Sequence, residues 1–134
     1  MKNKILIVDD DIDSAIIQQS ISQKLGYYTQ IAINGIDAIK FIKQDQPDII
    51  LLDIFMPQMD GLETASLIIS KYKIPIVVVT AGGNDTIKKI KELGVIFYVQ
   101  KPIVPNRLQK EINRCIKYYE NKETNRCVNE NKEI

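Results

Sequence analysis

The stretch from Asp48 to Gly61, DIILLDIFMPQMDG, gives the clearest indication of the fold class. Its four consecutive apolar residues, Ile49–Leu52, are typical of a central strand in a parallel sheet that helices cover on both faces. The run ends in a single carboxylate, Asp53, which therefore lies at the carboxyl end of the strand. In open α/β sheets, binding and catalytic sites form at that edge. Short polar residues also follow strands simply to form turns, so Asp53 alone leaves both interpretations open.

The rest of the chain repeats this pattern of strand followed by helix. Apolar, strand-like runs alternate with segments whose apolar residues recur every three or four positions. Five such pairs joined by short links predict an α/β fold, with a five-stranded parallel sheet and five helices on both faces. The expected strands are residues 4–8, 28–33, 49–52, 74–79 and 95–100, each followed by a helix.

Two of the expected helices carry informative apolar patterns. In the first, Ile17, Ile21 and Leu25 are spaced four residues apart and predict the face toward the sheet, with Gly26 ending the helix. The helix expected over residues 84–93 has a thin apolar face, so we expect it to pack least firmly.

Length and composition indicate one domain. The chain has 134 residues, which is enough for a hydrophobic core, and we assign residues 1–120 to the domain. Residues 121–134 contain almost no apolar side chains and predict a polar, disordered tail or the start of a linker.

The charge balance indicates no affinity for nucleic acid or membranes. Eighteen basic and seventeen acidic residues create no strong overall field, and we expect neither direct nucleic-acid binding nor membrane binding. The sequence opens without a signal peptide and has no apolar stretch long enough to span a bilayer, so a cytoplasmic location is expected.

Cysteine and histidine usage narrows the possible chemistry. Cys115 and Cys127 match no metal-binding or redox spacing, so both are expected to be reduced thiols. The sequence contains no histidine, which excludes a histidine general base, histidine metal ligands and a phosphohistidine carrier. Chemistry must therefore use carboxylates, lysine, threonine and tyrosine.

Functional groups follow four of the five expected strands. In a parallel sheet these groups share one edge, where carboxylates about 4 Å apart repel by roughly 4 kcal/mol per pair at an effective dielectric near 20. A hard divalent cation, Mg²⁺ or Mn²⁺, would relieve this repulsion. The alternative for the acidic run after the first strand is solvated turn residues or a helix cap, a role we expect for Asp11 or Asp13. The groups are Asp9 and Asp10, then Asp53, Thr80 and Lys101.

This set of residues suits phosphoryl transfer to a carboxylate. Asp53 can attack a phosphoryl group and become an aspartyl phosphate. Lys101 can offset the charge on the transferred group, and Thr80 can donate a hydrogen bond to it. Phosphoryl transfer depends mainly on positioning and charge stabilisation, so a site without histidine is sufficient.

Four motifs resemble the receiver domain of two-component response regulators. They are VDDD at Val8–Asp11, LLDIFMPQMDG at Leu51–Gly61, VVVTA at Val77–Ala81 and YVQKP at Tyr98–Pro102. Their order and spacing are similar to the family from about residue 4 to residue 119. The resemblance implies a flavodoxin-like (CheY-like) fold and phosphorylation by a sensor histidine kinase or a histidine phosphotransfer protein.

The resemblance also implies roles for individual residues. Asp53 would be the phosphorylated residue, and Asp9 and Asp10 would hold the metal together with Asp53 and the backbone carbonyl of Phe55. Thr80 and Lys101 would contact the phosphoryl group. Tyr98 would be the aromatic switch residue.

By the same resemblance, a downstream protein would bind the face formed by the fourth helix, the fifth strand and the last helix. Phe55 and Gly82 occupy positions that influence the lifetime of the phosphoryl group in the family. The protein would be a phosphoacceptor and not a turnover enzyme, and either a monomer or a phosphorylation-dependent dimer.

The leading hypothesis is a stand-alone receiver, and three alternatives accompany it. The chain could be the receiver portion of a longer regulator. It could be a Mg²⁺-dependent phosphatase that forms an aspartyl phosphate, although Phe55 stands where such enzymes usually have a second carboxylate. A flavin- or nucleotide-binding domain is disfavoured because three aspartates after the first strand would repel a phosphate tail.

Overall fold

The computed structural model describes residues 3–56 and 61–132, with side chains described as far as Lys122. Within these residues, all five strands are parallel and form one sheet in the order β2-β1-β3-β4-β5. The order places β1 and β3 side by side at the centre. The strands are β1 (Lys4–Val8), β2 (Tyr28–Ala32), β3 (Ile49–Leu52), β4 (Ile76–Thr80) and β5 (Phe97–Gln100).

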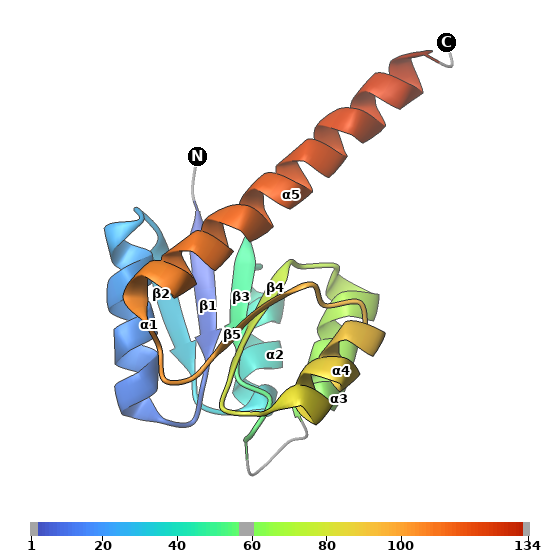
Figure 1. Cartoon of the computed structure of the whole chain (residues 1–134). Coiled ribbons are helices and arrows are strands. Elements are labelled where there is room, and N and C mark those ends of the chain that lie inside the picture. The colour runs from blue at the N-terminus through green and yellow to red at the C-terminus, as the bar shows by residue number, and fades with distance from the viewer. Residues whose placement is uncertain (1–2, 57–60, 133–134) are drawn as a thin grey trace.

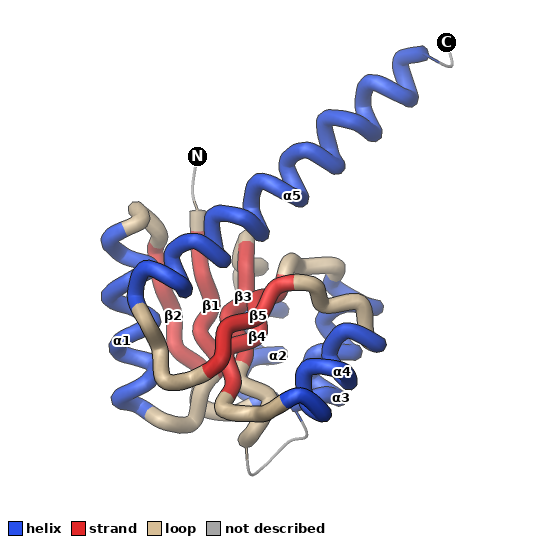
Figure 2. Tube along the Cα trace, viewed as in Figure 1, coloured by secondary structure: helices blue, strands red, loops and turns tan. Residues whose placement is uncertain are grey.

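Helices cover both faces of the sheet, as Figures 1 and 2 show. Alternate residues of a strand face opposite sides, so Ile5 and Ile7 pack with α1 and α5, whereas Leu6 and Val8 pack with α2, α3 and α4. The α/β fold predicted from the sequence, with a five-stranded parallel sheet between helices, is confirmed. The helices are α1 (Ile12–Lys24), α2 (Gly35–Gln44), α3 (Gly61–Leu67), the π-helical turn η1 (Ile68–Tyr72), α4 (Asn84–Glu92) and α5 (Pro105–Lys132).

The inward face of α1 differs from the predicted one. Ile17 was expected to face the sheet, but 46% of its surface is exposed. The buried stripe instead contains polar side chains spaced four residues apart, with Ile21 beside them. Residues four apart share one helix face, and the apolar spacing predicts a stripe that is rotated toward solvent from the observed one. The buried residues of α1 are Ser14, Ala15, Gln18, Ile21 and Ser22.

Helix α5 anchors the chain to the sheet and then continues past it. Leu108, Ile112 and Cys115 are fully buried, and burial raises the pKa of the Cys115 thiol to about 12. The sequence predicted a disordered tail from residue 121, but the helical backbone continues to Lys132 and extends beyond the sheet (Figure 1). Extending a helix that is already docked avoids the cost of nucleation, so the polar segment can remain helical.

No helix in the described part of the chain, the 28-residue α5 included, combines the length and apolar character needed to cross a bilayer.

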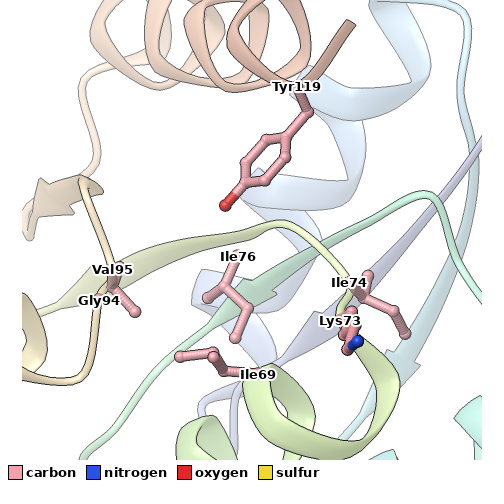
Figure 3. Close-up of a pocket in the computed structure, with 7 residues that line it drawn as sticks. All are labelled: Ile69, Lys73, Ile74, Ile76, Gly94, Val95 and Tyr119. Atoms are coloured by element: carbon pink, nitrogen blue, oxygen red, sulfur yellow. The ribbon is translucent and has the colours of Figure 1, made fainter. Parts of the chain in front are cut away.

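A small pocket of about 180 Å³ lies near the beginning of β4. Figure 3 shows the Tyr119 hydroxyl directed from α5 toward Ile69 and Ile76, with Val95 at the side. Because Ile76 begins β4, this pocket lies away from the carboxyl end of the strand, where Thr80 is found.

Gly61 gives a direct test of the packing between α3 and the chain that leaves β3. A Cβ atom at Gly61 would overlap the backbone of Ile54. We therefore expect Gly61→Ala to lower the free energy of unfolding in urea by about 2 kcal/mol, the typical cost of overpacking.

Gly83→Ala is the matched control, because a Cβ there meets no atom within 4 Å. It should change the free energy of unfolding by less than about 0.5 kcal/mol. Equal losses in the two variants would contradict this account of Gly61.

Candidate functional site

The pairing of β1 with β3 brings two buried carboxylates together. Val8 and Leu52 are register partners at the ends of these strands, and the Asp53 N–H donates to the Val8 carbonyl at 2.9 Å. Asp9 and Asp53 therefore directly follow neighbouring strands and lie at the same edge of the sheet. Their exposed fractions are 0% and 5%, so both carboxylates need partners within the protein.

Lys101 provides the shared partner of these carboxylates. Its backbone N–H donates to the Thr80 carbonyl at 2.8 Å, which fixes the start of the loop after β5 beside the end of β4. The Lys101 ammonium lies 2.9 Å from Asp9 Oδ2 and 2.9 Å from Asp53 Oδ2. Three residues far apart in sequence thus meet at the carboxyl edge of the sheet.

Asp10 completes an acidic group suited to a divalent cation. One carboxylate oxygen from each of Asp9, Asp10 and Asp53 lies within 4.8 Å of the others, and Asp10 is exposed. Three carboxylates against the single ammonium of Lys101 leave two formal negative charges when all are ionised. Carboxylate oxygens are the ligands that Mg²⁺ and Mn²⁺ prefer, so the residues present fit such an ion.

The environment changes the proton affinities of Asp53 and Lys101. Burial raises the pKa of Asp53, and the nearby Asp9 adds to the increase, while hydrogen bonds from Phe55 N–H and Lys101 offset it in part. Burial by itself would lower the pKa of Lys101, but hydrogen bonds to Asp53 and Asp9 outweigh burial and raise it. The lysine therefore remains an ammonium at neutral pH, whereas ionised Asp53 carries a desolvation cost.

Thr80 lies at the same edge but has a different hydrogen-bond partner. Its side chain is buried at the end of β4, and its Oγ1 accepts a hydrogen bond from Gly82 N–H at 3.2 Å. Gln100 Nε2 donates to the Gly82 carbonyl at 3.1 Å. The loop after β4 is therefore held by its own turn and by β5.

Phe55 lies next to Asp53 and packs over Gly82. Its N–H donates to Asp53 Oδ1 at 2.9 Å, and its side chain is 54% exposed. A Cβ at Gly82 would lie 2.7 Å from Phe55 Cε2 and 2.6 Å from the side chain of Thr86. The absence of a side chain at Gly82 thus makes room for the Phe55 ring. The turn predicted to begin at Met56 and Pro57 extends into residues 57–60, outside the described residues.

Tyr98 is half-buried on β5, beside α4. Lys91 Nζ lies 5.6 Å from the centroid of the Tyr98 ring, and the Tyr98 N–H donates to Glu111 Oε2 of α5 at 3.2 Å. Tyr98 therefore contacts both helices that flank β5. Its proposed role as a switch residue stays a prediction.

Comparison with known families identifies the domain type. Residues 5–113 match the response regulator receiver domain. The chain belongs to the response regulator receiver domain family.

Solved receiver domains have the same architecture. CheY4 of Vibrio cholerae is 30% identical, with a TM-score of 0.76 over 86% of this chain and 99% of that chain. The NtrX receiver domain of Brucella abortus is 26% identical, with a TM-score of 0.77 over 84% of this chain and 98% of that chain. A CheY-like receiver domain protein of Methanospirillum hungatei, 24% identical, has a TM-score of 0.84 over 91% and 99% of the two chains and supports the CheY-like fold.

Sequence reasoning missed one residue at the site of this receiver domain. Gln18 Nε2 donates to Asp9 Oδ2 at 3.0 Å from the buried face of α1. The available signal was the repeat of polar residues Ser14, Gln18 and Ser22 every fourth position, directly after the acidic run. The predicted inward face rests on the apolar residues of this helix alone, so it does not include these polar side chains.

The raised pKa of Asp53 predicts that the receiver is more stable without this charge. Below the ordinary value of 3.8, Asp53 is protonated in both the folded and unfolded states, and no penalty arises. Above the raised folded-state pKa, the ionised carboxylate destabilises the folded state. Without divalent cations at pH 7, we therefore expect Asp53→Asn to raise the melting temperature.

The difference should shrink as the pH falls toward 3.8, and thermal unfolding of both proteins at several pH values measures it. A lower melting temperature for Asp53→Asn at pH 7 would show that the ion pair with Lys101 outweighs the burial of the carboxylate.

Proposed function

We propose that this receiver accepts a phosphoryl group on Asp53 in the cytoplasm and then presents an altered surface to a partner protein. The donor is a sensor histidine kinase or a histidine phosphotransfer protein. The observation that carries the proposal is the Lys101 ammonium 2.9 Å from both Asp9 and Asp53, with Asp10 in the same acidic group. This arrangement places a carboxylate nucleophile, a cation-binding group and a charge-stabilising lysine together.

Mg²⁺ or Mn²⁺ would be held by Asp9, Asp10 and Asp53 with the backbone carbonyl of Phe55. When bound, the ion supplies positive charge that offsets the charge on the phosphoryl oxygens. The exposed position of Asp10 leaves an entry path from solvent on that side. On the side of the acidic group away from solvent, Asp9 is buried and is held by hydrogen bonds from the protein.

The transfer step needs little beyond these residues. An Asp53 oxygen attacks the phosphorus, and the new P–O bond forms as the bond from phosphorus to the donor histidine nitrogen breaks, leaving its electron pair on that nitrogen. Lys101 then shifts its ammonium from the carboxylates toward a phosphoryl oxygen. The Thr80 hydroxyl turns from the Gly82 amide to donate to another phosphoryl oxygen. Asp53 reacts as a carboxylate, so no general base is required.

The surface change would involve α4 and β5. The buried side chains of α4, a helix that the structure describes in full, are Ile87 and Ile90, so few apolar contacts hold this helix. Movement of Thr80 toward the phosphoryl group would allow Tyr98 to turn inward and would shift a population of states already present. The altered face, formed by α4, β5 and α5, would bind the downstream protein.

The chemistry is tested by labelling with acetyl phosphate and Mg²⁺. Asp53→Asn should abolish labelling because the amide is not a nucleophile. Lys101→Ala should still bind Mg²⁺ but label about 100-fold more slowly, as expected for loss of one charge-stabilising group. Incorporation is followed by the mass of the intact protein.

Asp48→Asn is the matched control, because Asp48 directly precedes β3 at the opposite end from Asp53; it should label like the wild type. Persistent labelling of Asp53→Asn would place the nucleophile elsewhere. Continuous turnover of a simple phosphate ester would support the phosphatase alternative instead.

The switch is tested by amide hydrogen exchange with and without beryllium fluoride and Mg²⁺, which together mimic the phosphoryl group. We expect exchange to change across residues 84–98, since α4 and β5 respond to Thr80. Asp53→Asn, which cannot form the mimic, should show no such change. Identical exchange over this segment in the treated and untreated wild type would exclude this face as the one that responds.

A further inference from the structure

The face of α1 that packs on the sheet is unusually polar. Ser14, Gln18 and Ser22 are buried there, although the inward face of a surface helix is normally apolar. Glutamine is seldom fully buried, yet Gln18 is 1% exposed. Every buried side-chain nitrogen and oxygen in the described residues has a hydrogen-bond partner. The polar side chains of this stripe therefore form hydrogen bonds with specific groups of the protein.

Gln18 connects this stripe to the acidic site. Its Nε2 donates to Asp9 Oδ2 at 3.0 Å and lies 3.3 Å from both the backbone carbonyl and the hydroxyl oxygen of Ser14. Ser22 Oγ donates to the backbone carbonyl of Gln18 at 2.8 Å, one turn farther from the site. Within the stripe, Gln18 is thus the residue whose side chain contacts Asp9, and Ser14 holds its amide in place.

The hydrogen bonds that described residues donate to Asp9 come from three directions. Asp11 N–H donates to Oδ1 at 3.0 Å, while Gln18 and Lys101 both donate to Oδ2. The Lys101 ammonium competes electrostatically with a divalent cation for this carboxylate, and in the proposed transfer it moves away. The neutral amide of Gln18 brings no net positive charge that would repel a cation. It can therefore keep the carboxylate oriented after Lys101 has left.

We propose that Gln18 is a positioning residue that holds the Asp9 carboxylate in the orientation needed to bind a divalent cation. This proposal rests on the metal site in the proposed function and adds a residue outside the acidic group. Carboxylates that ligate metals are commonly oriented by hydrogen bonds from neighbouring groups, and loss of such a partner weakens metal binding about 10- to 100-fold. Without the Gln18 amide, Asp9 would lose one of its two neighbours on Oδ2 and could rotate.

The test measures binding of Mn²⁺ alone by electron paramagnetic resonance, with MnCl₂ titrated into the metal-free protein and no phosphodonor present. Gln18→Leu and Gln18→Met both remove the donor, and the unbranched methionine keeps the length of the side chain. We expect both to raise the dissociation constant about tenfold. Gln18→Met provides the measurement if Gln18→Leu does not fold.

Ser22→Ala is the matched control, because Ser22 is buried on the same stripe and its hydroxyl donates to a backbone carbonyl in place of a site residue. It should change the dissociation constant less than about twofold. A merely structural role of Gln18 would lower the melting temperature of the metal-free protein without changing Mn²⁺ affinity. In acetyl phosphate labelling, the Gln18 variants should need about tenfold more Mg²⁺ for half-maximal rate, with the rate at saturating Mg²⁺ nearly unchanged.

Two results would overturn the proposal while leaving the proposed function intact. One is Mn²⁺ affinity within twofold of wild type in the Gln18 variants, and the other is equal weakening in Ser22→Ala. If the wild type itself bound no Mn²⁺, the metal site and the role of Gln18 would both be wrong.

Discussion

One lysine forms ion pairs with two buried aspartates, and these ion pairs hold three strand ends of the sheet together. Parallel pairing of β1 with β3 places Asp9 and Asp53 side by side, and the protein buries both. Removing the lysine would leave two buried carboxylates without a counter-charge, at a cost of roughly 3–5 kcal/mol. The end of β5 must therefore deliver Lys101 to this point, which its backbone bond to Thr80 ensures. The same lysine is a counter-ion in the resting protein and the proposed ligand of the phosphoryl group.

The two sides of this ionic group differ in how many buried contacts hold the neighbouring residues. Toward α1, Asp9 is held by the Asp11 amide and by Gln18. Toward α4, the loop after β4 is held by hydrogen bonds at Gly82, and α4 itself buries few side chains. Segments with few buried apolar contacts open most easily. This asymmetry gives a physical reason for the proposed response to travel toward α4 and β5 while the proposed cation-binding side stays in place.

Sequence reasoning correctly predicted the features that depend on neighbouring residues. It was wrong where the packing of the whole domain selects one of several arrangements that the local sequence allows. The unbroken apolar run of β3 and the carboxylate after it predicted the central strand and the edge of the site. Ile17 was placed inward because it shares a four-residue spacing with Ile21, although packing turned a polar stripe to the sheet. Gln18 was missed for the same reason. The polar end of α5 was expected to lack structure because composition does not report that a docked helix already precedes it.

The alternation of strands and helices, and the position of each candidate site residue at the end of a strand, could be predicted from the sequence alone. Both follow from periodicity and from residue order, which need no knowledge of distant contacts. Only the folded structure shows that Lys101 forms one ion pair with Asp9 and a second with Asp53, and that an amide from α1 reaches Asp9. These contacts join residues 9 to 92 positions apart, so they depend on strand order and on the rotation of α1. Strand order and helix rotation follow from the packing of the whole domain and not from any single stretch.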